Sequence, residues 1–352
     1  MKIVTCEQVS NGHPDKICDQ VADAIVTDCL QYDKRSRVAI ECLVKDDRLV
    51  IAGELTSLRK PDYNELVGEV LDRIGRNKLD YGSGPRLEIL VREQSGDIAM
   101  GVDTGGAGDQ GMMYGYATNE TEEMLPVPYV LATRFLERLK NCGDERFKAD
   151  AKAQVSFDYE NQKITTFLCS VQHREECEPE EFAPLIGEMM EEVASDYGYG
   201  PGFKKLVNPT GRFVMGGSFA DCGVTGRKLA CDTYGGVGRI GGGALSGKDP
   251  TKVDRSGAYA AREIAKRIVR FGWSDRCEVQ IAYAIGVAEP VSVYVDTFGT
   301  EHVDKKDLEA YVRAFDLTPK EIIRRLRLLY VDYNRVSSYG HFMDGGMPWE
   351  LG

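Results

Sequence analysis

Residues 38–55 read VAIECLVKDDRLVIAGEL, two runs of strand-forming residues on either side of a charged turn at 45–48. This pattern predicts a β-hairpin. A helical pattern precedes it, from about Asp15 to Leu30, with apolar residues repeating on one face. A second helix follows, opened by Pro61-Asp62 and running through Ile74. The start of the chain therefore predicts a helix, a hairpin and a helix in that order.

The same order of elements recurs twice. In the second unit the expected elements are a helix over 127–139, strands over 154–159 and 163–171, and a helix over 179–197. In the third unit they are a helix over 261–271, strands over 277–285 and 291–295, and a helix over 308–315. Three such units predict an α+β fold, with β-hairpin sheets packed under helices, and not a doubly wound parallel sheet.

We expect three domains, at 1–98, 104–213 and 215–352. The apolar face of each sheet should meet the other units or a partner subunit. Two glycine-rich stretches, 96–115 and 216–247, lie between the units and show few helix or strand patterns. We expect them to be loops, and long loops of this kind commonly carry function.

The composition is that of a globular protein, with 42% hydrophobic and 28% charged residues. No apolar run approaches the roughly 18–20 residues that span a bilayer. Residues 1–7 do not resemble a secretory signal, so the cytoplasm is the expected location. The net charge of -12 disfavours a nucleic-acid partner, because such binding needs an excess of clustered Lys and Arg. A small anion could still be held by a local basic pocket.

Cysteine and histidine usage limits the kinds of metal site. The ten cysteines are scattered without a CxxC pair, which predicts reduced and mostly buried thiols. The four histidines do not stand at metal-ligand spacing from one another or from a cysteine. This argues against zinc or iron, so any metal ion should be held by oxygen ligands.

A first candidate site is Asn11-Gly12-His13-Pro14-Asp15-Lys16, just before a helix. Free N–H groups and the helix dipole favour an anion there, and His13 and Lys16 would add donors. The simpler interpretation makes Asp15 a first-turn carboxylate and His13 a loop residue.

A second candidate is the pair of carboxylates in the first hairpin, Glu41 and Glu54. With the turn centred on 46–47, residue 41 stands opposite 52 and residue 39 opposite 54, so the two carboxylates are diagonal neighbours on one face. If that face is exposed, they need no partner. If it is buried, they need cations, for example a metal ion for one and an ammonium group for the other.

A third candidate is the run from Gly106 to Gly111, GAGDQG, which alone is best interpreted as a flexible turn. The fourth is the segment 216–255. Its residues 242–248 resemble a Walker A loop, but Asp249 replaces the required Ser or Thr, so this is not a standard P-loop. Its glycines nevertheless accompany four cationic side chains, which suits a polyphosphate. These cations are Arg227, Lys228, Lys248 and Lys252. Asp254 could simply cap the next helix.

Taken together, these motifs resemble the S-adenosylmethionine synthetase (methionine adenosyltransferase) family almost from end to end. Five ordered stretches carry the resemblance. They are Gly12 to Lys16, Gly106 to Gly111, Asp150-Ala151-Lys152, Asn208 to Phe213, and Gly241 to Arg255. The resemblance implies three intertwined, pseudo-threefold-related α/β domains. It also implies a homodimer with active sites at the interface, possibly paired into a homotetramer.

The resemblance further implies that ATP and L-methionine are the substrates and that Mg²⁺ and K⁺ are the cofactors. Catalytic roles would fall to His13, Lys152, Arg227 and Lys248. The ATP-binding residues would be His13, Asp150, Lys152, Arg212, Phe213, Asp221, Arg227, Lys228, Ala244, Lys248 and Ile285, with Phe213 and Ile285 on either side of the adenine. The methionine-binding residues would be Glu54, Gln94, Asp109, Asp221 and Lys252. Asp15 and Asp254 would hold Mg²⁺, and Glu41 would hold K⁺.

The implied reaction is attack of the methionine sulfur on C5′ of ATP, followed by hydrolysis of tripolyphosphate to pyrophosphate and phosphate. A thioether carries no proton, so no general base is needed. The barrier lies in geometry and in the charge on the leaving group. Cations therefore become the expected catalytic groups.

Some positions depart from the family pattern. Asn11 stands where an acidic residue is common, the chain stops soon after Trp349, and the segment 95–105 is short for a gating loop. We expect this short loop to be mobile and to discriminate less against ethionine. Two other functions compete with the transferase, namely a phosphotransferase or NTPase built on 242–248, and a non-catalytic nucleotide-binding protein. Asp249 argues against the first, and the full set of cations argues against the second.

Overall fold

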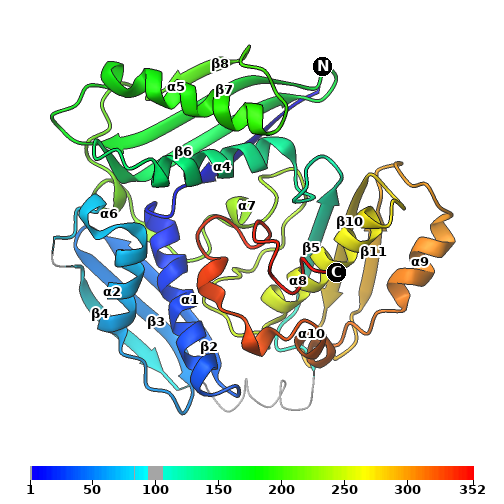
Figure 1. Cartoon of the computed structure of the whole chain (residues 1–352). Helices are drawn as coiled ribbons and strands as arrows, with labels where there is room; N and C mark the ends of the chain where they lie inside the picture. Colours follow the sequence, from blue (N-terminus) through cyan, green and yellow to red (C-terminus); the bar gives the residue numbers. More distant parts are fainter. Residues whose placement is uncertain (1, 83, 94–105) are drawn as a thin grey trace.

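The chain folds into three lobes, each built on a β-sheet covered by helices, and Figure 1 shows the lobes around a common centre. The computed structural model describes residues 2–82, 84–93 and 106–352. The α+β class expected from the sequence is confirmed. Within these ranges, no helix has the length and apolar character needed to cross a membrane. All ten cysteines are free thiols and seven of them are buried, as expected.

Each lobe has one sheet. The first has the order β4 (Arg86–Arg92), β3 (Arg48–Thr56), β2 (Arg37–Lys45) and β9 (Gly223–Val224). The second has the order β1 (Ile3–Val9), β6 (Phe147–Asp158), β7 (Lys163–His173) and β8 (Lys204–Val207). The third has the order β11 (Ser292–Asp296), β10 (Arg276–Tyr283) and β5 (Gly111–Thr118).

One long helix packs on each sheet near the centre of the molecule. These are α1 (Pro14–Tyr32) on β2, α4 (Val127–Asn141) on β6, and α8 (Val253–Arg270) on β5. Figure 1 shows the three helices surrounding the middle of the molecule. In the described residues the other helices are α2 (Tyr63–Ile74), α5 (Pro179–Asp196), α6 (Gly217–Ala220), α7 (Leu229–Asp232), α9 (Lys305–Arg313) and α10 (Pro319–Arg325). Short 3-10 turns occupy Arg76–Lys78, Leu328–Tyr330 and Tyr333–Arg335.

Local chemistry fixes the helix ends. α1 begins at Pro14, a residue suited to the first helical position, and the His13 side chain accepts a hydrogen bond from the backbone N–H of Asp15 as the N-cap. α2 begins where Asp62 accepts from the N–H groups of Asn64 and Glu65, and it ends at Gly75 in the left-handed region.

The lobes exchange strands. β1 pairs antiparallel with β6, from Ile3 opposite Asp158 to Val9 opposite Lys152. β5 likewise pairs along its whole length with β10, and β9 pairs with β2. Each sheet therefore joins segments that lie more than a hundred residues apart in the sequence.

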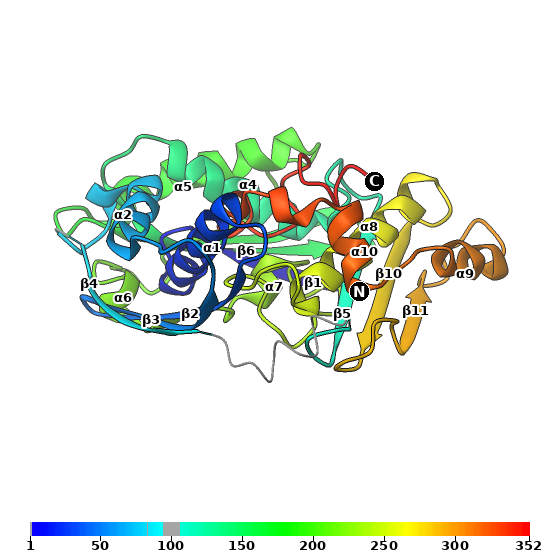
Figure 2. The same cartoon turned by 90° about the horizontal axis from the view of Figure 1, so that it is seen from below.

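Figure 2 shows the strands of the first and third sheets along one side of the molecule, with the C-terminal segment on the other side. Large apolar side chains stay exposed on these sheets. Leu43 is 41% exposed and Leu90 56% in the first sheet, and Met112 is 55% exposed and Tyr294 53% in the third. We call these two surfaces the open sheet faces.

The C-terminal segment folds back onto α8. Arg262 pairs with Glu350 at 2.9 Å and also donates to the carbonyl oxygens of Tyr116, Glu123 and Met124. The Trp349 ring stacks on Tyr259, with ring centroids 3.6 Å apart. The segment thus completes the core between the lobes.

The structure extends several expected elements. Five strands, β1, β4, β5, β8 and β9, were not expected, and β5 begins inside the first glycine-rich stretch. The second glycine-rich stretch carries the short elements α6, β9 and α7. Helix α8 starts at Val253, eight residues before the apolar pattern at Ala261. The register of the first hairpin is as predicted, with Ala39 opposite Glu54 and Glu41 opposite Ala52.

Candidate active site

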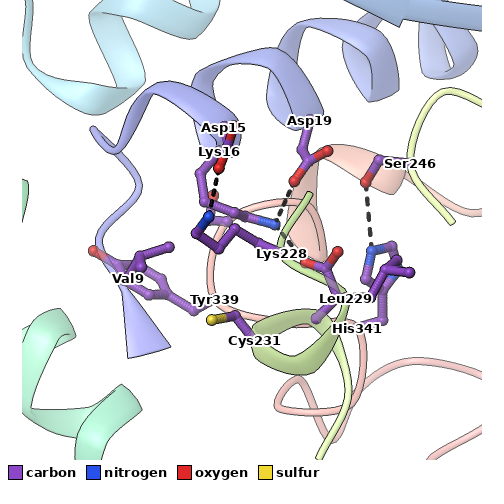
Figure 3. Close-up of polar contacts among 12 residues, drawn as sticks. Val9, Asp15, Lys16, Asp19, Lys228, Leu229, Cys231, Ser246, Tyr339 and His341 are labelled. Carbon is purple, nitrogen blue, oxygen red and sulfur yellow. Dashed lines mark hydrogen bonds and ion pairs between the residues drawn. The ribbon is translucent and has the colours of Figure 1, made fainter. Parts of the chain in front are cut away.

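The N-terminus of α1 is the focus of the site. The Asp15 side chain is fully buried, and its Oδ1 accepts a hydrogen bond from the backbone N–H of Val224 at 2.8 Å. The Nζ of Lys228 lies 2.5 Å from Asp15 Oδ2, and the Nε of Arg227 lies 3.3 Å from Oδ1. Figure 3 shows Lys228 reaching Asp15 from the loop before α7. The two carboxylate oxygens of Asp15 therefore contact two cations at the N-terminus of α1.

His13 is buried beside this cluster, and its Nδ1 accepts from the backbone N–H of Asp15 at 3.2 Å. Burial, together with the nearby charge of Lys228, lowers the pKa of His13 to about 3. The ring is therefore neutral at physiological pH. Because Nδ1 is an acceptor, the proton lies on Nε2, which is then a donor.

A second cation–carboxylate pair comes from the loop before α8. Lys248 forms an ion pair with Asp254 in the first turn of that helix. The N-cap position belongs to Lys252, so Asp254 is not the capping residue. Gly243 passes so close to the Asp254 carboxylate that a Cβ atom at 243 would lie 2.1 Å from its carbon. A side chain at position 243 would therefore displace the Asp254 carboxylate from this position.

The third element is the start of β6, which supplies Asp150 and Lys152. Asp150 is buried, and one of its oxygens accepts from the backbone N–H of Gly217 at 2.8 Å. Among the described residues its other oxygen, Oδ1, has no hydrogen-bond partner. Burial raises the pKa of Asp150 to about 6. Lys152 is exposed, and its charge acts on both Asp150 and His13.

Beneath the cluster lies a layer of buried ion pairs. The Nζ of Lys16 lies 2.6 Å from Asp232 and 3.1 Å from Asp19, and all three side chains are almost completely buried. Burial acts to lower the pKa of Lys16, but the charges of Asp19 and Asp232 outweigh it and keep the pKa above its ordinary value. The Nη2 of Arg255 donates to both carboxylate oxygens of Asp23, at 2.6 and 2.8 Å.

The glycine-rich motif 106–111 contacts the loop at Ile285 and approaches the start of α8. Ala107 exchanges two backbone hydrogen bonds with residues 286 and 287, next to Ile285. A Cβ atom at Gly111 would lie 3.8 Å from the Asp254 carboxylate. The motif therefore links the loop at Ile285 with the Lys248–Asp254 pair. Strand β5 begins at its last residue, Gly111.

Other candidate residues lie nearer the surface. Arg212 donates to the carbonyl of Glu175, and the backbone N–H of Phe213 donates to His173, both at the edge of the second lobe. Ile285 is 63% exposed on the third lobe. Asp221 is exposed, although its charge acts on His13 and Asp150. Ala244 is half-buried in the loop before Lys248.

The residues expected to bind methionine and K⁺ are less enclosed. Glu41, Glu54 and Asp109 are exposed, the first two on the open face of the first sheet. Lys252 pairs with Asp249, the residue at the Ser or Thr position of a Walker loop. Asp249 is buried and accepts from the backbone N–H of Val38, so it has a structural role. Gln94 and the segment 95–105 lie outside the described residues.

Sequence reasoning missed the buried carboxylates of α1 and their partners. Asp19, Asp23, Asp232 and Arg255 were not among the candidates, although the spacing of Asp15, Asp19 and Asp23 places all three on one helix face. That spacing was the available signal. In the described residues, no group of three or more His, Cys, Asp or Glu side chains is arranged to hold a metal ion alone.

A cavity of about 1000 Å³ lies elsewhere, between α4, α5 and the loop at 119–123. Charged groups in its wall pair with one another, for example Arg134 with Glu123 and Arg138 with Asp196. The cluster at the N-terminus of α1 is therefore the better candidate for chemistry.

Comparisons with known proteins point to one family. Three family models match in order, namely the S-adenosylmethionine synthetase N-terminal domain at residues 1–95, the central domain at 104–213, and the C-terminal domain at 215–351. The chain is also similar to an S-adenosylmethionine synthase of Mesoplasma florum. The two are 44% identical over 365 aligned positions, which cover 99% of this chain and 97% of the relative.

Proposed function

The chain belongs to the S-adenosylmethionine synthetase family, and from this premise we propose that the cluster at the N-terminus of α1 binds the triphosphate of ATP. The protein is a methionine adenosyltransferase, which makes S-adenosylmethionine from ATP and methionine. Two observations support the site: Arg227 and Lys228 pair with Asp15 at the N-terminus of α1, and Lys248 pairs with Asp254 in the first turn of α8.

The proposed chemistry follows from the residue types. The methionine sulfur attacks C5′ of ATP, a C–S bond forms, and the C5′–O bond breaks to release tripolyphosphate. Negative charge grows on the departing oxygen. Arg227, Lys228, Lys248 and Lys152 would stabilise that charge, and no side chain has to remove a proton.

His13 would donate a hydrogen bond to the leaving oxygen through Nε2–H. Two observations support this role. The ring is neutral, and its Nδ1 is already occupied as the helix N-cap. The cap interaction thus fixes both the tautomer and the direction of the donor.

The residues present fit Mg²⁺. This ion prefers oxygen ligands and is commonly bound through one or two carboxylates plus phosphate oxygens and water. Asp15 and Asp254 are two such carboxylates, and each is paired with a lysine. When bound, Mg²⁺ would neutralise phosphate charge, and Lys228 and Lys248 would be released to pair with phosphate oxygens.

Substrate selection is proposed for the more exposed residues. Phe213 and Ile285 would contact the adenine, with Arg212 and Ala244 beside it, and Asp150 Oδ1 offers a free acceptor for a ribose hydroxyl. Glu54, Gln94, Asp109, Asp221 and Lys252 would contact methionine, where a carboxylate suits the ammonium group and a lysine suits the carboxylate. Glu41 would bind K⁺. After transfer, the same cations would hold tripolyphosphate while it is hydrolysed to pyrophosphate and phosphate.

We further propose a homodimer formed through the open sheet faces, possibly paired into a tetramer. The exposed apolar side chains Leu43, Leu90, Met112 and Tyr294 support this, because monomers rarely leave such surfaces uncovered. A partner there would also cover Glu41 and Glu54. Domain boundaries at 98/104 and 213/215 and a cytoplasmic location complete the proposal.

The proposal is tested by incubating the protein with ATP, methionine, Mg²⁺ and K⁺ and identifying the products by mass spectrometry. S-adenosylmethionine, pyrophosphate and phosphate are expected in equal amounts. Release of ADP would contradict the proposed use of the cluster, because it would mean that the γ-phosphate is transferred instead. Omitting each cation in turn tests the two metal assignments.

A further inference from the structure

We propose that Asp19 and Asp23 are positioning residues for the transfer reaction, which hold in place the two loops that carry Lys228 and Lys248. The inference rests on the proposed function of those lysines. It assigns a role to two carboxylates that would not touch substrate or metal.

The observation is a ladder of three aspartates along α1. Asp15, Asp19 and Asp23 stand four residues apart, so they lie on one helix face, and all three side chains are fully buried. Each accepts one backbone N–H from the segment 224–247, either from strand β9 or from a loop after it. The donors are Val224 for Asp15 at 2.8 Å, Gly226 for Asp19 at 2.9 Å, and Gly247 for Asp23 at 2.9 Å.

The Asp19 contact fixes the first loop. Gly226 immediately precedes Arg227 and Lys228, so its hydrogen bond to Asp19 fixes the position of both cations along α1. The far end of the loop is tied to the same helix, because Lys16 bridges Asp19 and Asp232. Figure 3 shows the contact between Lys16 and Asp19 beside Lys228. The short segment between these ties has little freedom to move.

The Asp23 contact fixes the second loop. Gly247 immediately precedes Lys248, and its carbonyl accepts from the backbone N–H of Ile40 at 2.9 Å. Gly247 has a φ of 83°, and a Cβ atom there would lie 2.0 Å from the Ile40 carbonyl oxygen. Only glycine allows the loop to insert between α1 and β2. Arg255 pairs with the same carboxylate and connects the loop to α8.

This arrangement matters because lysine is a point charge on a flexible stem, whose position depends on its backbone. A misplacement of 1 Å can cost about 10²-fold in rate. A buried carboxylate that accepts a backbone N–H is a firm anchor, because an unpaired charge there would be costly. One helix thereby sets the spacing of cations from two separate loops.

The experiment is a double-mutant cycle on Asp19 and Lys228, with the rate of S-adenosylmethionine formation measured at saturating substrates. Asp19→Ala removes the acceptor for Gly226. Because Lys16 keeps Asp232 as its partner, this variant is expected to fold, which circular dichroism will check. We expect kcat to fall about tenfold or more, with KM for methionine little changed. In the Lys228→Ala background, Asp19→Ala should cause a smaller fall in kcat, because only Arg227 is then left to be misplaced.

Several outcomes would overturn the proposal. An equal fall in both backgrounds would make Asp19 a general stabilising residue, and an unchanged kcat in Asp19→Ala would remove its role altogether. If Lys228→Ala itself leaves kcat unchanged, Lys228 is not part of a phosphate site. This outcome contradicts the proposed function, and the single variant distinguishes it from the two outcomes that contradict only the role of Asp19. Asp19→Asn, which keeps one acceptor oxygen, should restore most of the rate that Asp19→Ala loses.

The same cycle with Asp23 and Lys248 tests the second loop. Asp23→Asn keeps an acceptor oxygen but leaves Arg255 with less charge compensation, so the protein's melting temperature is measured beside kcat. Asp28→Ala is the matched control, because Asp28 lies on the same helix but pairs with Arg59, away from both loops. It should leave kcat unchanged.

Discussion

The side of the site built on α1 is closed by contacts within the chain, whereas the side built on β2, β3 and the loop at Ile285 is open. On the first side, Asp15, Asp19 and Asp23 are fully buried, and each has a partner cation. On the second side, Glu41 and Glu54 are exposed, and Ile285 is 63% exposed. In the proposed function, the closed side binds the polyphosphate, and the open side binds methionine and adenine. Predictions on the two halves should differ accordingly.

The largest effect is expected for the stability of the closed half. Lys16→Met would leave Asp19 and Asp232 buried without their cation, and breaking a buried pair typically costs about 3–5 kcal/mol in free energy of unfolding. Urea denaturation at pH 7 measures it. Arg313→Met, which breaks an exposed pair with Glu309, should cost less than about 1 kcal/mol. Similar losses of unfolding free energy in both variants would show that the buried ion pairs of Lys16 stabilise the protein no more than an exposed pair does.

The next effect concerns catalysis by the closed half. Lys248→Ala and Asp254→Asn should each lower kcat by about 10²–10³-fold, as losses of charge-stabilising groups commonly do. The melting temperature should change little, because both side chains are partly exposed. Lys163→Ala, an exposed lysine on β7, is the control and should keep its activity. Near-normal turnover in either folded site variant would count against the phosphate pocket.

A smaller effect concerns the pH dependence of stability. The pKa of His13 is lowered to about 3 in the folded protein, so between pH 6.5 and pH 3 the unfolded chain binds a proton that the folded chain does not. Stability therefore falls as pH drops below 6.5. From pH 6.5 to pH 5 the contribution of His13 is about 2 kcal/mol. His13→Asn can still cap α1. Between pH 6.5 and pH 5 its free energy of unfolding should fall by about 2 kcal/mol less than that of the parent. Parallel curves for parent and variant would refute the assignment.

The smallest effect belongs to the open half. Glu41→Gln should abolish most of the stimulation by K⁺, a change of a few-fold in rate, without affecting the free energy of unfolding. Activity is measured against K⁺ concentration at fixed ionic strength. Glu88→Gln, a carboxylate on the same open face, should keep the K⁺ response of the parent. Unchanged K⁺ dependence in Glu41→Gln would move the K⁺ site elsewhere.

Much of the fold could be predicted because local signals agreed with tertiary structure. The first hairpin shows this best, since its turn residues and strand formers fixed a register that the structure confirms. Strand β5 could not be predicted, because its glycines suggested a loop. A Cβ atom at Gly115 would lie 2.0 Å from Ala261 of α8, so packing against that helix and not turn formation explains this glycine.

The site was predicted where charge stood out from its surroundings. Lys228 and Lys248 became candidates because cations in a glycine-rich loop are unusual, whereas Asp254 became one through the family resemblance. Asp19 and Asp23 were missed because aspartates opposite an apolar helix face normally point to solvent. Here the helix face that carries the aspartates is buried against residues 224–247. No local sequence pattern indicates contacts between residues so distant in the sequence.

The exchange of strands between lobes also has a consequence during synthesis. Strand β1 is made first, but its partner β6 extends to Asp158 and emerges about 150 residues later. At typical translation speeds of 5–20 residues per second, β1 therefore waits roughly 10–30 s on the ribosome before its sheet can form. The nascent chain must carry the unpaired edge Ile3–Val9 throughout that interval. A pause in translation within the first 150 codons would lengthen this exposure, so codon usage there could affect yield without changing a residue.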